Sequence, residues 1–127
     1  MRRSDQRRAA VFALYQAEVT GRPAPDLLEP SATAFTRELV GGVLSERDTL
    51  DDLISRHASG WSLDRIAPLE RSILRVALHE LRSRPDVPAE VAIDEAVEAA
   101  KELCSAETPA FVNGILGAVH RAQVAPR

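Results

Sequence analysis

The sequence has few of the residues that indicate covalent cross-links or β-structure. Its 127 residues include one cysteine, one tryptophan, one tyrosine and three phenylalanines. A single cysteine, Cys104, cannot form an internal disulfide, which indicates a reducing compartment. Residues that favour strands nowhere alternate with polar ones over strand-length runs, so helices are the expected secondary structure.

Long hydrophobic runs are also missing. Arg, Asp or Glu interrupts every apolar stretch before it reaches the roughly 20 residues that a membrane-spanning helix needs. The first residues, MRRSDQRR, lead into no hydrophobic signal region. We therefore expect a cytoplasmic protein, and the 45% hydrophobic and 28% charged residues are typical of one globular domain.

Residues that build metal or catalytic sites are sparse and scattered. The three histidines are widely separated: His57, His79 and His120. His79 begins a zinc-binding pattern, but Ser83 stands where the second histidine should be. Cys104 follows an apolar stripe and is interpreted as a small buried residue. Because no glycine-rich phosphate loop is present either, we expect no metal, no cofactor and no catalytic residue.

What the sequence does contain is helical periodicity, in segments bounded by capping residues, glycine or proline. Ser4 or Asp5 can cap a first helix that Gly21 ends, and Ser31 or Thr33 can begin a second. Later helices are expected from Pro68 to before Pro85, from about Pro88, and from Thr108. The prediction is an all-α fold, a compact bundle of about six or seven helices.

Glycines inside two of these segments predict close packing. Gly41 and Gly42 each cost about 1 kcal/mol in a helix relative to alanine, so the segment either bends there or packs closely against a neighbour. We favour close packing, although Ser45 with Asp48 could cap a new helix after a break. Gly114 likewise predicts a close helix contact.

Charge is unevenly distributed along the chain, whose formal net charge is −3. Residues 1–22 carry five arginines against two acids, whereas residues 86–107 carry seven acids against one lysine. Arginine forks onto phosphate oxygens and stacks on bases, so the RRSDQRR segment favours RNA, with a solvated leader as the alternative. Asp94, Glu98 and Glu102 repel one another at four-residue spacing, so their face is solvated or paired with another element.

Two further residue interpretations remain open. Phe111 is more often a core residue than a base-stacking platform at such spacing. Arg75 on the central helix and Glu95 on the next are expected to form a partly buried bridge that fixes how the two helices dock.

Read in order, several segments resemble the NusB family. They are RRAAVFALYQAE, FTRELVGGV, LERSILRVALHEL, VPAEVAIDEAVEAAK and FVNGIL, and together they cover nearly the whole chain. The resemblance implies a single NusB-like domain over residues 1–127, with an N-terminal helical subdomain at about 1–60, a C-terminal one at about 61–122 and a frayed tail at 123–127. It also implies no catalysis.

The same resemblance implies a function and partners. Members of this family pair with the ribosomal protein NusE, bind single-stranded boxA RNA of ribosomal RNA leaders with it, and join the antitermination complex of RNA polymerase. Some members form homodimers. By position, the implied RNA-binding residues are Arg2, Arg3, Arg7, Arg8, Glu107 and Phe111, and the implied contact to the partner protein is Glu70.

The sequence departs from the family pattern at two places, and two rival functions remain. Ala110 stands where a basic residue is frequent, and Ala58 where some members have an aromatic. The first rival is a protein-only adaptor whose acidic helix, Asp94 to Glu102, docks a basic partner. The second is a methyltransferase, since such a domain begins certain ribosomal RNA methyltransferases, but the chain contains no glycine-rich cofactor loop.

Overall fold

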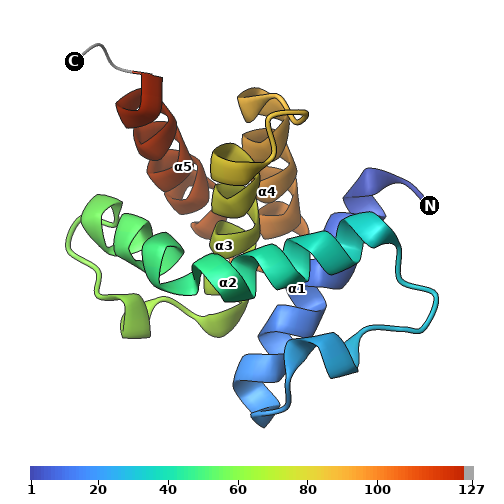
Figure 1. Ribbon diagram of the computed structural model, residues 1–127. Helices are drawn as coiled ribbons and strands as arrows, with labels where there is room; N and C mark the ends of the chain where they lie inside the picture. The colour runs from blue at the N-terminus through green and yellow to red at the C-terminus, as the bar shows by residue number, and fades with distance from the viewer. Residues whose placement is uncertain (125–127) are drawn as a thin grey trace.

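The computed structural model describes residues 1–124, and over that range it consists of five α-helices and two short 3₁₀ helices (Figure 1). In chain order they are α1 (Arg3–Thr20), η1 (Ala24–Leu27), α2 (Ala34–His57), η2 (Leu63–Arg65), α3 (Pro68–Ser83), α4 (Ala89–Leu103) and α5 (Thr108–Val124). The all-α prediction is confirmed. The predicted number of six or seven helices is slightly too high, because α2 runs unbroken through Gly41 and Gly42.

Helix α3 is the centre of the bundle, and α1, α2, α4 and α5 all pack against it. Figure 1 shows α2 crossing α3, with α5 to the left of α3 and α4 to its right; α4 and α5 also pack against each other. Every residue of α3 from Ser72 to Glu80 is buried, because neighbours surround the helix on all faces. Across the described range, no helix combines the length and hydrophobicity that crossing a membrane requires.

Helix ends follow the predicted capping residues in the middle of the chain. Thr33 caps α2 by accepting a hydrogen bond from the Thr36 backbone N–H at 3.2 Å. Pro68 is the first residue of α3, and Gly21 ends α1 with a left-handed φ of 77°. The predicted cap of α1 is wrong, since Arg2 occupies that position and the Ser4 hydroxyl instead donates to Glu95 at 2.9 Å.

The two predicted glycine contacts have different outcomes. A Cβ added at Gly42 would lie 2.1 Å from Cε1 of His79, so α2 and α3 touch there as predicted. By contrast, a Cβ at Gly114 would meet nothing within 4 Å, and the close contact expected at that residue is wrong. The predicted frayed tail is helical as far as Val124, and its residues 125–127 lie outside the described range.

Candidate nucleic-acid and partner-protein interface

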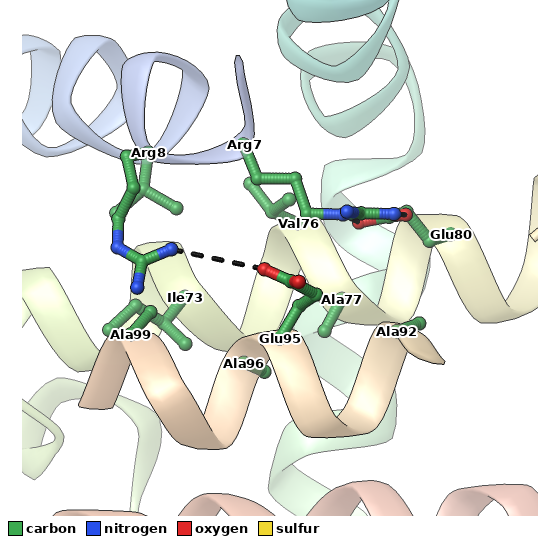
Figure 2. A pocket seen from close by; sticks show the side chains of 11 residues that line it. Arg7, Arg8, Ile73, Val76, Ala77, Glu80, Ala92, Glu95, Ala96 and Ala99 are labelled. Carbon is green, nitrogen blue, oxygen red and sulfur yellow. Dashed lines mark hydrogen bonds and ion pairs between the residues drawn. The ribbon is translucent and has the colours of Figure 1, made fainter. Parts of the chain in front are cut away.

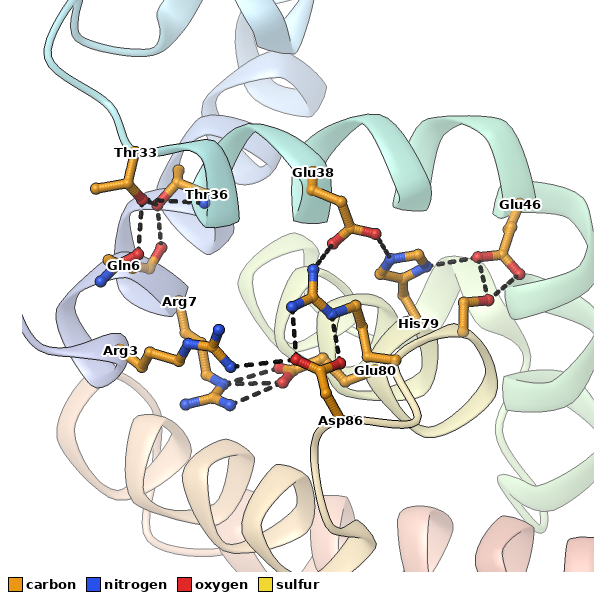
Figure 3. A network of polar contacts seen from close by, with 12 residues as sticks. Arg3, Gln6, Arg7, Thr33, Thr36, Glu38, Glu46, His79, Glu80 and Asp86 are labelled. Atoms are coloured by element: carbon orange, nitrogen blue, oxygen red, sulfur yellow. Dashed lines mark hydrogen bonds and ion pairs between the residues drawn. The ribbon is translucent and has the colours of Figure 1, made fainter.

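Arg2 and Arg3 begin α1 and keep their side chains largely accessible. The Arg2 side chain is 85% exposed and lies 3.7 Å from Asp5. The Arg3 guanidinium stacks over the ring of Phe35, 4.1 Å from its centroid, and lies 3.6 Å from a carboxylate oxygen of Asp86 (Figure 3). Pairs this exposed contribute little to stability, so both arginines remain available to an external anion.

Arg7 is placed differently, because its side chain is buried. Its Nε and Nη2 donate to the two carboxylate oxygens of Glu80 in α3, at 2.9 Å and 2.8 Å (Figure 3). A bidentate pair of this kind uses the N–H donors of the guanidinium that would otherwise bind phosphate. Arg7 therefore holds α1 against α3.

Arg8 brings the start of α1 to the end of α4. Its guanidinium donates to Glu102 at 2.9 Å and lies 3.9 Å from Glu95, and its side chain is 17% exposed. Figure 2 shows Arg8 reaching down from α1 toward Glu95 and Ala99 on α4. The predicted acidic face is thus solvated at Asp94 and Glu98 and paired with another helix at Glu102, as the repulsion between its members required.

Phe111 lies in a surface pocket of about 370 Å³ at the start of α5. Its ring meets that of Trp61 edge to face, with centroids 5.9 Å apart and an interplanar angle of 65°. Glu70, Glu107 and Thr108 line the same pocket, and the Thr108 hydroxyl donates to Glu70 at 2.8 Å. Helix packing thus gathers three of the predicted site residues, Glu70, Glu107 and Phe111.

The arginine end of α1 and this pocket are linked by a short stretch of chain. Glu102, the partner of Arg8, precedes Glu107 by five residues, which span at most about 18 Å. Arg8 and the pocket therefore flank the α4–α5 connection, whereas Arg3 lies near the other end of α4, beside Asp86. The predicted RNA residues are therefore spread from one end of α4 to the other rather than gathered in one cluster.

Trp61 is a residue of this pocket that the sequence did not indicate. It lies between α2 and η2, is 51% exposed and packs on Phe111. The signal available in the sequence was that it is the single tryptophan of a chain with few aromatics. Ala58, the C-cap residue of α2, is buried.

The predicted bridge between Arg75 and Glu95 is wrong. Arg75 donates to Asp51 of α2 at 2.7 Å and to Glu18 of α1 at 2.5 Å, because its side chain points to the side of α3 away from α4.

The hydrogen bonds and positive charge of the neighbouring arginines also change the pKa of Glu18. Burial alone would raise the pKa of Glu18, but the bonds from Arg75 and Arg71 outweigh it and hold that pKa below 4.5.

No feature of the described residues supports catalysis at the pocket. Burial, together with the negative charge of Glu70, raises the pKa of the Cys104 thiol above its ordinary value of 9.0, so the thiol stays protonated. Within residues 1–124, no three His, Cys, Asp or Glu side chains gather in a way that could hold a metal ion. The accessible chemistry is that of a binding surface, with cationic, aromatic and carboxylate groups.

Comparison with known proteins gives one consistent family. The model of the NusB family matches residues 4–121. The transcription antitermination protein NusB of Myxococcus xanthus is 43% identical over 126 residues, covering 89% of this chain and 90% of its own, and that of Frankia casuarinae is 50% identical over 91 residues, covering 72% and 67%.

Solved structures of NusB proteins have the same fold as this chain. NusB of T. maritima superposes with a TM-score of 0.86 at 33% identity, covering 95% of this chain and 92% of its own. A structure of antitermination factors NusB and NusE in complex with dsRNA gives a TM-score of 0.83 over 94% and 96% of the two chains, and at 24% identity it shows the shared fold.

Proposed function

The chain belongs to the NusB family, and we propose that it works in the cytoplasm as an antitermination adaptor that binds single-stranded boxA RNA together with the ribosomal protein NusE. Family membership makes it a regulatory protein of transcription and not an enzyme. The observation that carries the proposal is that Arg8 and the Phe111 pocket flank the same α4–α5 connection.

The RNA would follow a strip from the start of α1 to the start of α5. Arg2, Arg3 and Arg8 are proposed to contact phosphates, with Arg8 exchanging Glu102 for the incoming anion. Phe111 is proposed to stack with a base, and Glu107 to accept hydrogen bonds from base amino groups. Arg7 is retained as a positioning residue that holds this part of α1 in place through Glu80.

NusE would bind beside the RNA and contact Glu70, and the pair would join the antitermination complex of RNA polymerase. The solved complex of NusB, NusE and dsRNA supports both classes of partner for the family. In this chain Glu80 and Glu102 already pair with two of the four N-terminal arginines. Affinity for RNA alone should therefore be low, and NusE is proposed to supply part of the positive surface.

The test compares RNA binding with and without NusE at several salt concentrations. About three phosphate contacts predict a log–log salt slope of roughly −2 for a single strand. Replacing Arg2, Arg3 and Arg8 together with alanine should flatten that slope while circular dichroism stays helical. Arg56→Ala is the matched control, because Arg56 is an exposed arginine of α2 that pairs with nearby Asp52. An unchanged slope in the triple variant would place the RNA elsewhere.

A second candidate is the protein-only adaptor, which docks a basic partner on α4. It is favoured by the internal pairing of Arg7 and Arg8, which removes positive charge from the proposed RNA strip. Solution mass with NusE and with boxA RNA separates the two functions and reports any homodimer. A stable complex with NusE that never retains RNA above an unrelated acidic helical protein would favour this second candidate.

A further inference from the structure

A groove at the opposite end of α1 is lined by four arginines. It has a volume of about 630 Å³ and lies between the end of α1, the η1 segment, the middle of α2 and the start of α3. We call it the arginine groove, after four of its lining residues: Arg22, Arg47, Arg71 and Arg75. Glu18 lies ten residues after Arg8 on the same helix, about 15 Å along its axis, so the groove is separate from the proposed RNA strip.

The groove already holds one carboxylate of the chain itself. Glu18 accepts hydrogen bonds from Arg75 at 2.5 Å, from Arg71 at 2.7 Å and from Arg47 at 3.0 Å. Asp51 of α2 also pairs with Arg75, at 2.7 Å. Four guanidinium groups therefore face two carboxylates, which leaves two positive charges unbalanced in a protein whose net charge is −3.

The unbalanced charge lies at the mouth of the groove. Arg75 is buried, and Arg71 is anchored by the backbone carbonyls of Leu63 and Ile66. Arg47 pairs with Glu18 at 3.0 Å and lies 3.8 Å from Asp51, but its side chain is 46% exposed. No carboxylate of residues 1–124 lies within 4.0 Å of the Arg22 guanidinium. These two arginines have donors available to an external anion.

The walls of the groove indicate the class of that anion. Leu44, which is 40% exposed, and Pro23 give it an apolar side, and none of the described residues that line it is aromatic. Single-stranded nucleic acids are usually held by positive charge together with aromatic stacking, which this groove does not offer. Apolar walls beside arginine forks instead match a peptide that alternates carboxylates with aliphatic side chains.

We propose that the arginine groove is a docking site for an acidic, leucine-bearing segment of a protein partner. A carboxylate of the partner binds Arg22 and Arg47, next to the carboxylate of Glu18 that the same groove holds. An aliphatic side chain of the partner packs on Leu44 and Pro23. None of the residues proposed above to contact RNA or NusE lines this groove.

The experiment measures binding of a fluorescent probe peptide that alternates Glu with Leu to the full chain by anisotropy. The variant Arg22→Glu with Arg47→Glu is expected to weaken binding about tenfold or more, because two charge-assisted contacts become repulsive. Leu44→Ser should weaken the Glu–Leu peptide but not a Glu–Gly peptide. Arg56→Glu, on the same helix outside the groove, should change neither.

Thermal unfolding of each variant controls for folding, and an oligouridine probe tests the nucleic-acid alternative. Equal affinity of the wild type and the double variant for the Glu–Leu peptide, or no saturable binding to either, would overturn the proposal. Oligouridine binding that the double variant loses would also overturn it, and would identify the groove as a nucleic-acid site.

Discussion

At the scale of single residues, the four arginines of the N-terminal segment RRSDQRR have different environments, which the sequence alone does not show. Arg2 and Arg3 are exposed at the helix start, while Arg7 is buried on Glu80 and Arg8 is held by Glu102. Removing one partner of a buried pair leaves an uncompensated charge, which is strongly destabilising. Loss of RNA binding in an Arg7 variant would therefore not by itself identify Arg7 as an RNA contact.

Gly42 gives a prediction at the same scale, with Gly41 as its matched control. In Gly42→Ala the new methyl group would overlap the ring of His79, which is held between Glu38 at 2.8 Å and Glu46 at 2.5 Å. We expect this variant to lower the free energy of unfolding by about 1 to 3 kcal/mol, as overpacking does. Gly41→Ala meets nothing within 4 Å and should raise it by up to about 1 kcal/mol.

Urea denaturation of both variants measures the difference. Equal stability of the two variants would contradict the close contact between α2 and α3 at Gly42.

At the scale of elements, Glu18 ties α1 to both α2 and α3 through Arg47, Arg71 and Arg75. Its pKa is held below 4.5 in the folded protein, so its ionised form contributes stability above that pH. That contribution is lost as the pH falls through the lowered pKa. In Glu18→Gln, the decrease in unfolding free energy between pH 7 and pH 3 should be smaller than in the wild type.

Chemical denaturation at a series of pH values measures this decrease. Asp52→Asn, which removes an exposed carboxylate paired within α2, is the control and should leave the decrease nearly unchanged. An identical pH dependence in Glu18→Gln and the wild type would show that the arginines do not act through Glu18.

The helices themselves were largely predictable from the sequence, because their signals are local. Pro68 and Pro85 bracket α3, and Gly21 marks the end of α1. Contacts between helices were harder to predict from the sequence. The partner of Arg75 depends on which side of α3 faces α2, and the broad apolar stripe of α3 does not determine that side.

The candidate site was predictable only in part, for the same reason. Resemblance of the sequence to a family indicated Glu70, Glu107 and Phe111, which the fold brings into one pocket. Trp61 was missed because its segment has no helical periodicity, and its contact with Phe111 joins residues fifty positions apart. Tertiary packing, rather than spacing, decides such contacts.

At the scale of the whole molecule, positive charge lies at both ends of α1, and at the start of the helix it faces negative charge on α4. The basic start of α1 lies against the acidic α4, so Arg8 and Glu102 neutralise one another. A second positive region, the arginine groove, lies at the other end of α1. The molecule therefore presents two regions of positive charge to anionic partners. Arg71 of the groove also bonds to the backbone carbonyl of Ile66, which lines the pocket of Phe111 and Glu70.

The most direct test of this account is amide hydrogen exchange of the chain in complex with NusE, measured before and after addition of boxA RNA. The account predicts that RNA slows exchange together at the start of α1, in the α4–α5 connection and at the start of α5, while α2 near the arginine groove is unchanged. Protection by RNA confined to the arginine groove, or absent from either the first helix or the Phe111 end, would contradict a single RNA surface formed by the two.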